Sequence, residues 1–127
     1  MSLPRHSAQM RNDIADAVLA AIDSGTAGNL IFKTAGDAVV ATLALQVPAG
    51  TVTGPTLTFT APNDDTNAAG NASPITKFSV EDSAAAEILT GDVTTVGVGT
   101  GDIQLDAVII DNGDTVSISS FSYTAPL

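Results

Sequence analysis

Cysteine is absent from the 127-residue sequence, and histidine occurs once. Disulfide bonds, thiolate nucleophiles and cysteine zinc sites are therefore excluded, and a single chain cannot assemble a cluster of histidine ligands. Aromatic residues make up 4% of the chain and tryptophan is missing, so large ring side chains are scarce. Because much of the apolar 44% is alanine and valine, we expect a thin core of small side chains.

Positive charge is also scarce in this chain. Four Lys and Arg stand against fourteen Asp and Glu, which gives a formal net charge of −10. Such a chain repels phosphate backbones and anionic membrane surfaces, so we expect neither nucleic acid nor membrane among its partners. No run approaches the roughly 18 apolar residues of a membrane span. The first six residues also lack the apolar stretch of a signal peptide.

One amphipathic helix is predicted near the N-terminus. Apolar residues recur every three or four positions along one stripe, which consists of Met10, Ile14, Ala17, Val18, Ala21 and Ile22. This is the period of a helix that buries one face. Ser7 is a suitable N-cap, and Gly25 ends the helix because glycine readily adopts the left-handed conformation. We therefore expect an extended arm over 1–7 and a helix over 8–24.

From residue 29 onward the pattern changes to period two. Apolar and polar residues alternate in short runs, which are centred on Leu43, Leu45 and Val47; Leu57 and Phe59; Phe78 and Val80; Ile103 and Leu105; and Val116 and Ile118, followed by Phe121 and Tyr123. Alternation buries one face of a strand and leaves the other wet, as in antiparallel sheets. The adjacent Ser119 and Ser120 break the alternation as a β-bulge does. Strands spaced by roughly ten residues favour a mainly β fold, and we expect an antiparallel β-sandwich or jelly roll over 29–127. The whole chain, 1–127, is expected to form a single domain.

Turn-forming residues separate these runs. Asn112-Gly113 lies between two apolar runs and is the preferred centre of a type I′ hairpin turn. The longest polar stretch, Ala61–Ser73, has no periodicity. We expect it to be an exposed loop that is either mobile or used for contact.

Two acidic segments, Asp111–Asp114 and Asn63–Asn67, carry the oxygen ligands that calcium prefers. A calcium loop of the EF-hand type needs acidic residues at alternate positions, a central glycine and a terminal glutamate. Neither segment has this spacing, so we interpret the first as a hairpin turn and the second as a solvated loop. We expect no bound metal and no cofactor.

The candidate catalytic groups are isolated from one another. Glu81, Asp82 and Glu87 are the carboxylates nearest to a glycosidase-like pair, but alternation places Glu81 on a wet face. His6 lies in the expected arm, which holds catalytic geometry poorly. The run Gly97–Gly101 lacks the Lys-Ser/Thr ending and the following helix of a phosphate-binding loop. We therefore expect no catalytic residue and no enzyme activity.

Short strands between Gly-Asp turns characterise the second half of the chain, in the runs Phe78–Asp82, Gly101–Leu105 and Gly113–Ile118. Together with the helix from Arg11 and the run Gly28–Phe32, this style resembles the small structural proteins of tailed phages and prophages over most of the chain. The resemblance implies a virion component made in the host cytoplasm. Within that class, a small acidic β protein is most similar to capsid decoration, or cement, proteins, which commonly sit as trimers on the shell.

We therefore expect a homotrimeric cement protein on the capsid surface, with the major capsid protein as its partner. A protein that clamps a lattice needs many weak contacts repeated by symmetry and no reactive groups. The arm Met1–Ser7 and the loop Ala61–Ser73 are expected to carry contacts to neighbours.

Three other functions remain open at this point. A tail or head–tail joining subunit belongs to the same class of virion protein. A carbohydrate- or receptor-binding module would use exposed aromatic side chains, whereas four of the five aromatics fall on predicted inward positions: Phe32, Phe59, Phe78 and Phe121. A hydrolase is the third alternative.

Overall fold

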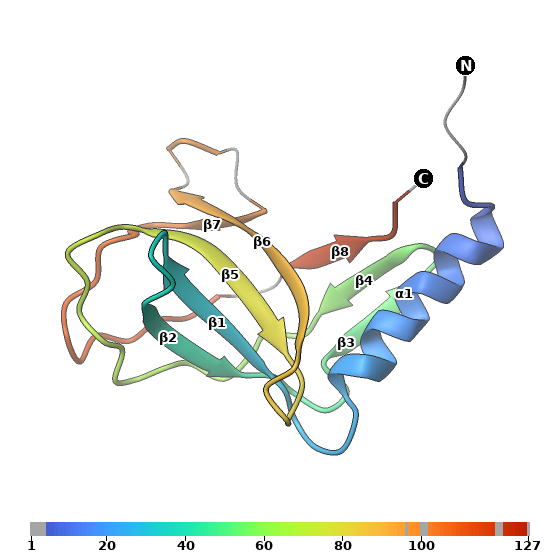
Figure 1. Ribbon diagram of the computed structural model, residues 1–127, viewed down its shortest axis with the longest axis horizontal. Coiled ribbons are helices and arrows are strands. Elements are labelled where there is room, and N and C mark those ends of the chain that lie inside the picture. The colour runs from blue at the N-terminus through green and yellow to red at the C-terminus, as the bar shows by residue number, and fades with distance from the viewer. Residues whose placement is uncertain (1–4, 96, 100–101, 119–120, 127) are drawn as a thin grey trace.

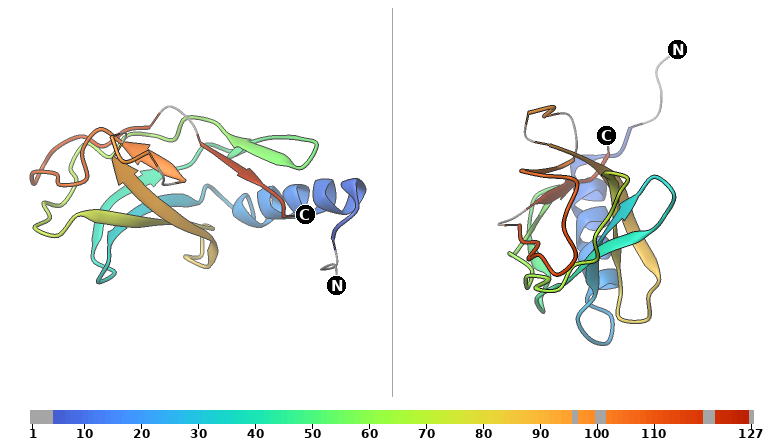
Figure 2. Two further views of the ribbon diagram at one scale, coloured as in Figure 1. Left: turned by 90° about the horizontal axis from the view of Figure 1, so that it is seen from above. Right: turned by 90° about the vertical axis from the view of Figure 1, so that its left-hand side faces the viewer.

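The computed structural model describes residues 5–95, 97–99, 102–118 and 121–126. In these residues one helix precedes eight strands: α1 (Ala8–Ile22), β1 (Asn29–Thr34), β2 (Val39–Ala44), β3 (Gly50–Thr53), β4 (Thr56–Phe59), β5 (Ile75–Glu81), β6 (Glu87–Thr95), β7 (Ile103–Leu105) and β8 (Ser122–Thr124). Figure 1 shows the helix beside the β3–β4 hairpin at one end of the molecule, with β1, β2 and β5 at the other. This arrangement makes the molecule longer than it is wide (Figure 2).

The strands form two sheets. One sheet has five strands in the order β2-β1-β5-β6-β7, and the other has three in the order β3-β4-β8. This mainly β, sandwich-like architecture with one N-terminal helix confirms the predicted fold class. The exception to the antiparallel expectation is the β6–β7 pair, which runs parallel with Val93 opposite Ile103. Alternation predicts which face of a strand is buried but not the direction of its neighbour, so the sequence pattern could not reveal this pair.

The core lies between the inner face of the five-stranded sheet, the three-stranded sheet and one end of the helix. Its largest fully buried side chains include Phe32, Leu30 and Val80 from the large sheet and Phe59 from the small one. The rings of Phe59 and Phe121 stack at a centroid distance of 4.0 Å. The predicted inward positions of the four phenylalanines are therefore confirmed, with Phe121 half-buried.

Helix α1 begins and ends close to the predicted residues, but it is rotated about its axis. The Ser7 side chain accepts a hydrogen bond from the Met10 N–H at 3.1 Å, which confirms the predicted N-cap. Ala15 and Ile22 are buried, whereas Met10 is 47% exposed and Ala17 is exposed. The predicted stripe is therefore right at its C-terminal end and wrong at Met10 and Ala17. The helix packs on β3 and β4, and the small Ala15 side chain allows this close approach.

Most of the predicted strands are present where the alternation placed them. The runs at Leu57, Phe78 and Ile103 lie in β4, β5 and β7, and Tyr123 lies in β8. The predicted run over Leu43, Leu45 and Val47 ends earlier than expected, since β2 stops at Ala44 and Val47 is 62% exposed. The predicted bulge at residues 119–120 and the first four residues of the expected arm lie outside the described residues.

Candidate functional site

The predicted hairpin around Asn112-Gly113 is the main departure from the sequence pattern, and it creates the candidate site. The turn exists: the Asp114 N–H donates to the Asp111 carbonyl at 3.1 Å, and Gly113 has a φ of 89°. A type I′ turn needs positive φ at both central residues, and Asn112 does not have it. The prediction of type I′ geometry is therefore wrong, and the chain segments on either side of the turn are not paired with each other as strands.

Each of these two segments is bonded to the loop 61–73 instead. Val116 exchanges two backbone hydrogen bonds with Asp65, at 2.7 and 3.0 Å, in an isolated bridge. The Asn71 side chain donates to the Val108 carbonyl and accepts from the Ile110 N–H, both at 2.9 Å. The expected strand over Val116 and Ile118 is thus reduced to one bridge, because the loop competes for the backbone groups that a hairpin would use.

Several hydrogen bonds attach the loop 61–73 to the rest of the molecule. The Asp65 carboxylate accepts from the Thr42 and Asn67 N–H groups, both at 2.9 Å. The Ala69 N–H donates to the Val40 carbonyl at 2.8 Å, and Ala68 is buried. The loop therefore covers the outer edge of β2. Within Asn63–Asn67 the other four residues are exposed, as expected of a solvated loop, and Asp65 is half-buried and bonded to Thr42 of β2.

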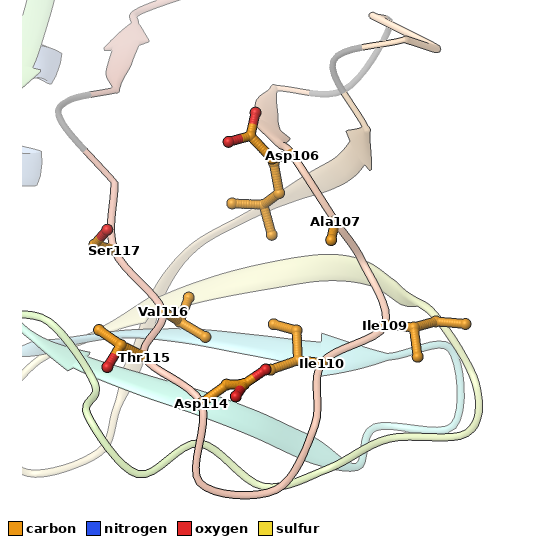
Figure 3. Close-up of a pocket in the computed structure, with 9 residues that line it drawn as sticks. Asp106, Ala107, Ile109, Ile110, Asp114, Thr115, Val116 and Ser117 are labelled. Atoms are coloured by element: carbon orange, nitrogen blue, oxygen red, sulfur yellow. The ribbon is translucent and has the colours of Figure 1, made fainter.

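Between the two segments lies an open depression, shown in Figure 3, which we call the acidic groove. Its first part has a volume of about 450 Å³ and is lined by residues of 105–107, 109–110 and 114–117. Its second part, of about 440 Å³, continues along 102–106 to 117–118 and 121–122. The two parts share Leu105, Asp106 and Ser117, so they adjoin. Ile110 and Val116 lie between the two segments at the closed end, where the turn joins them (Figure 3).

The charged residues that line the acidic groove are all carboxylates: Asp102, Asp106 and Asp114. Two of them already accept hydrogen bonds from the chain, since Asp102 accepts from the Asp92 N–H at 3.0 Å and Asp114 from the Asp111 N–H at 3.3 Å. Below them, Leu105 and Val116 form a buried apolar floor. The groove therefore combines an apolar floor with a negative rim, which is suited to binding a segment that is both apolar and cationic.

Neither acidic segment singled out from the sequence builds a metal centre. Among the described residues, no three His, Cys, Asp or Glu side chains come together in a way that could hold a metal ion. In the segment Asp111–Asp114, the carboxylate of Asp114 stabilises the turn. In the segment Asn63–Asn67, the carboxylate of Asp65 accepts backbone hydrogen bonds.

The three carboxylates considered for catalysis are separated by their local roles. Asp82 accepts from the N–H groups of Ala84 and Ala86, both at 2.9 Å, and so shapes the turn between β5 and β6. Glu81 and Glu87 lie opposite each other on these two strands. Glu87 is exposed and Glu81 half-buried, so the structure brings this pair together at the turn between β5 and β6 rather than in a dry cleft.

The two remaining candidates lie apart from the groove. His6 is exposed just before the helix. In the glycine run, the Gly99 N–H donates to the Thr95 carbonyl at 3.0 Å, whereas Thr100 and Gly101 lie outside the described residues. The described part of the run follows β6 as a turn, in agreement with the interpretation as a strand connection.

The groove residues Asp102 and Asp106 were not among the candidates drawn from the sequence. A signal for them exists, because they bracket the predicted strand at Ile103–Leu105 on both sides. Their significance depends on the open hairpin, however, and the strand pattern predicted a closed one.

Comparison with protein-family models, with curated proteins and with solved structures gave no match. The described residues also contain no helix that is long and apolar enough to cross a bilayer.

Proposed function

We propose that this protein is a structural component of a phage particle, a capsid decoration protein that binds the outer surface of the shell. The proposal starts from the resemblance in sequence style to small virion proteins. The observation that carries it further is the acidic groove, whose apolar floor and negative rim suit a protein contact. The major capsid protein is the proposed partner, and the capsid surface is the proposed location.

Self-association into a homotrimer belongs to the same proposal, and we assign it to the outer flank of α1. Met10, Ile14, Ala17 and Ala21 follow one another at intervals of four, three and four residues, the spacing of a coiled-coil contact. Met10 and Ala17 are exposed, because the helix buries Ala15 and Ile22 instead. The small alanines allow a second helix to approach closely.

The aromatic residues weigh against a carbohydrate-binding module. Such a module stacks sugar rings on exposed aromatic faces, but all five aromatic side chains here are buried or half-buried. Phe78 packs edge-on to Phe121 at 6.0 Å, so both rings are engaged within the molecule.

The deciding experiment is electron microscopy of purified particles that carry this protein with a label. We expect regularly spaced label over the shell, and removal of residues 1–7 is expected to lower shell occupancy. Label confined to the tail or to the head–tail junction would replace the decoration role with the joining role. Particles without label would contradict both roles.

A further inference from the structure

One wall of the acidic groove carries backbone groups that have no bonding partner among the described residues. The backbone of Val116 bonds to Asp65, which does not line the groove. In an extended chain, consecutive residues direct their N–H and C=O groups to opposite sides. Thr115 and Ser117 therefore direct theirs away from Asp65, and both residues line the groove.

The opposite wall is also an unpaired strand edge. Within the described residues, β7 is the last strand of the five-stranded sheet and has β6 as its strand neighbour on one side. Ile103 and Leu105 are buried beneath this edge. A strand edge with free backbone groups is a template for pairing with a further strand, and natural proteins usually cover or charge such edges.

The sequence on both sides of the groove has the pattern of paired strands. Val116 and Ile118 alternate with polar residues, and β7 shows the same alternation, yet the two runs do not pair with each other. A local strand pattern without strand partners is the kind of conflict that marks a functional site. An added strand would supply the missing hydrogen bonds to both walls.

The negative charge of the acidic groove restricts which kind of segment can bind in it. The rim carries Asp102, Asp106 and Asp114, and the described lining of both parts contains no Lys, Arg or His. A second copy of this chain is a poor match, because it has a net charge of −10 with four Lys and Arg in total. A segment with Lys or Arg beside small apolar residues complements both the rim and the floor.

We propose that an extended, Lys- or Arg-bearing segment of a different protein adds as a β-strand in the acidic groove, between β7 and the segment 115–118. Main-chain hydrogen bonds would hold the segment, and alternate side chains would reach the floor at Leu105 and Val116. This inference rests on the proposed function in one respect, namely that the protein acts by contact with other protein chains.

The test uses the full chain and three nine-residue peptides. The first alternates Val with Lys, the second replaces Lys with Glu, and the third is the first peptide with N-methyl groups on alternate backbone nitrogens. We expect the Lys peptide to shift the amide resonances of Thr115, Ser117 and Gln104. We also expect at least a tenfold weaker affinity for the Glu peptide and for the N-methylated peptide.

A matched pair of variants checks the location. Asp106→Asn removes a rim carboxylate and is expected to weaken binding of the Lys peptide severalfold. Asp16→Asn makes the same charge change on the exposed side of α1 and is expected to leave the affinity unchanged. Equal effects of the two variants, equal binding of all three peptides, or no binding at about 1 mM peptide would each overturn the inference.

Particle binding separates this inference from the proposed function. If the peptide results hold but Asp106→Asn decorates particles like the wild type, the groove binds a strand and its link to the shell is wrong. If the protein decorates particles and the peptides do not bind, the shell role stands and the groove inference is wrong.

Discussion

Gly91 shows how a single missing side chain shapes the core. It lies on β6 directly opposite Phe78 on β5. The space above it is filled by the Phe78 ring, which in turn meets Phe121 edge-on. Glycine at this position therefore allows an aromatic cluster to form beside the acidic groove.

Replacing Gly91 with alanine is expected to destabilise the protein. The new Cβ atom would lie 2.5 Å from Phe78 Cε1 and 2.8 Å from Asp102 Oδ2, and the ring cannot move away without disturbing the core. Overpacking of this kind costs about 1–3 kcal/mol, which urea denaturation would measure. Gly97→Ala is the control, because the nearest atom to its new Cβ would be Thr95 Oγ1, 3.9 Å away. Equal stability of both variants would contradict the packing argument.

The Lys77–Asp37 ion pair makes stability depend on pH at one surface site. The Lys77 Nζ donates a hydrogen bond to Asp37 Oδ1. This hydrogen bond and the positive charge lower the pKa of the Asp37 carboxyl from its ordinary value of 3.8. A lowered carboxyl pKa means that the contribution to stability is fully present above 3.8 and is lost as the pH falls through the lowered pKa.

Lys77→Gln is therefore expected to raise the pKa of Asp37 back toward 3.8, as followed by the carboxyl carbon shift in an NMR titration. Lys33→Gln is the comparison, since Lys33 makes the smallest of the contributions that lower this pKa. A larger change in the Lys33 variant than in the Lys77 variant would show that the ion pair is not the main cause.

Among the secondary-structure elements, helix α1 has two apolar faces with different roles. Ile22 is fully buried in the core, whereas Ile14 is half-buried on the flank that we assign to self-association. The helix end is fixed to the sheet as well, because the Asp23 carboxylate accepts from the Ala49 N–H at 3.0 Å. At the other end, Arg11 donates two hydrogen bonds to the Ala125 carbonyl, at 3.2 and 3.1 Å.

Ile14 and Ile22 provide a test of which face of α1 packs against the core. Ile22→Ala is expected to lower the free energy of unfolding by about 2–5 kcal/mol, because it leaves a cavity in the core. Ile14→Ala is expected to cost about 1 kcal/mol or less in the monomer, since alanine favours the helix and the position lies outside the core. Denaturation of both variants at low protein concentration measures the difference. A larger loss at Ile14 would mean that the helix faces the sheet as the sequence pattern predicted.

Elements differ in how well the sequence predicted them. The N-cap at Ser7 and the strands at Leu57, Phe78 and Ile103 were predicted, because capping and alternation are local signals. β1 has no alternation, since the three residues over 30–32 are all buried in the middle of the sheet. The candidate groove could not be predicted, because it arises where an expected strand pairing fails to form.

For the molecule as a whole, the excess negative charge opposes association of identical copies unless an apolar contact offsets it. The exposed stripe on α1 is the self-contact that we propose, and the acidic groove, which is lined by residues within 102–118 and 121–122, is the proposed contact for a cationic partner. Assembly with itself and binding to another protein would therefore use different surfaces.

Two glutamate variants on α1 test the assembly. Ala17→Glu places a charge on the proposed contact stripe and is expected to convert a trimer to a monomer in native mass spectrometry. Ala20→Glu makes the same change at an exposed position about a quarter of a turn from the centre of the stripe, on the side that carries Asp13 and Asp16. It is expected to leave the trimer intact. A wild-type monomer at high concentration, or a trimer that survives Ala17→Glu, would contradict this surface.

Local periodicity and composition were enough to predict the helix, most of the strands, the small aromatic core and the strong negative charge. Long-range contacts were needed to establish that β6 and β7 run parallel, that the helix turns Ala15 inward, and that the segments around Asn112-Gly113 stay apart. These outcomes depend on competition between distant backbone groups. Asp65 and Asn71 bond to backbone groups that a closed hairpin would have used. The local sequence pattern does not determine whether these groups pair with the loop 61–73 or with each other.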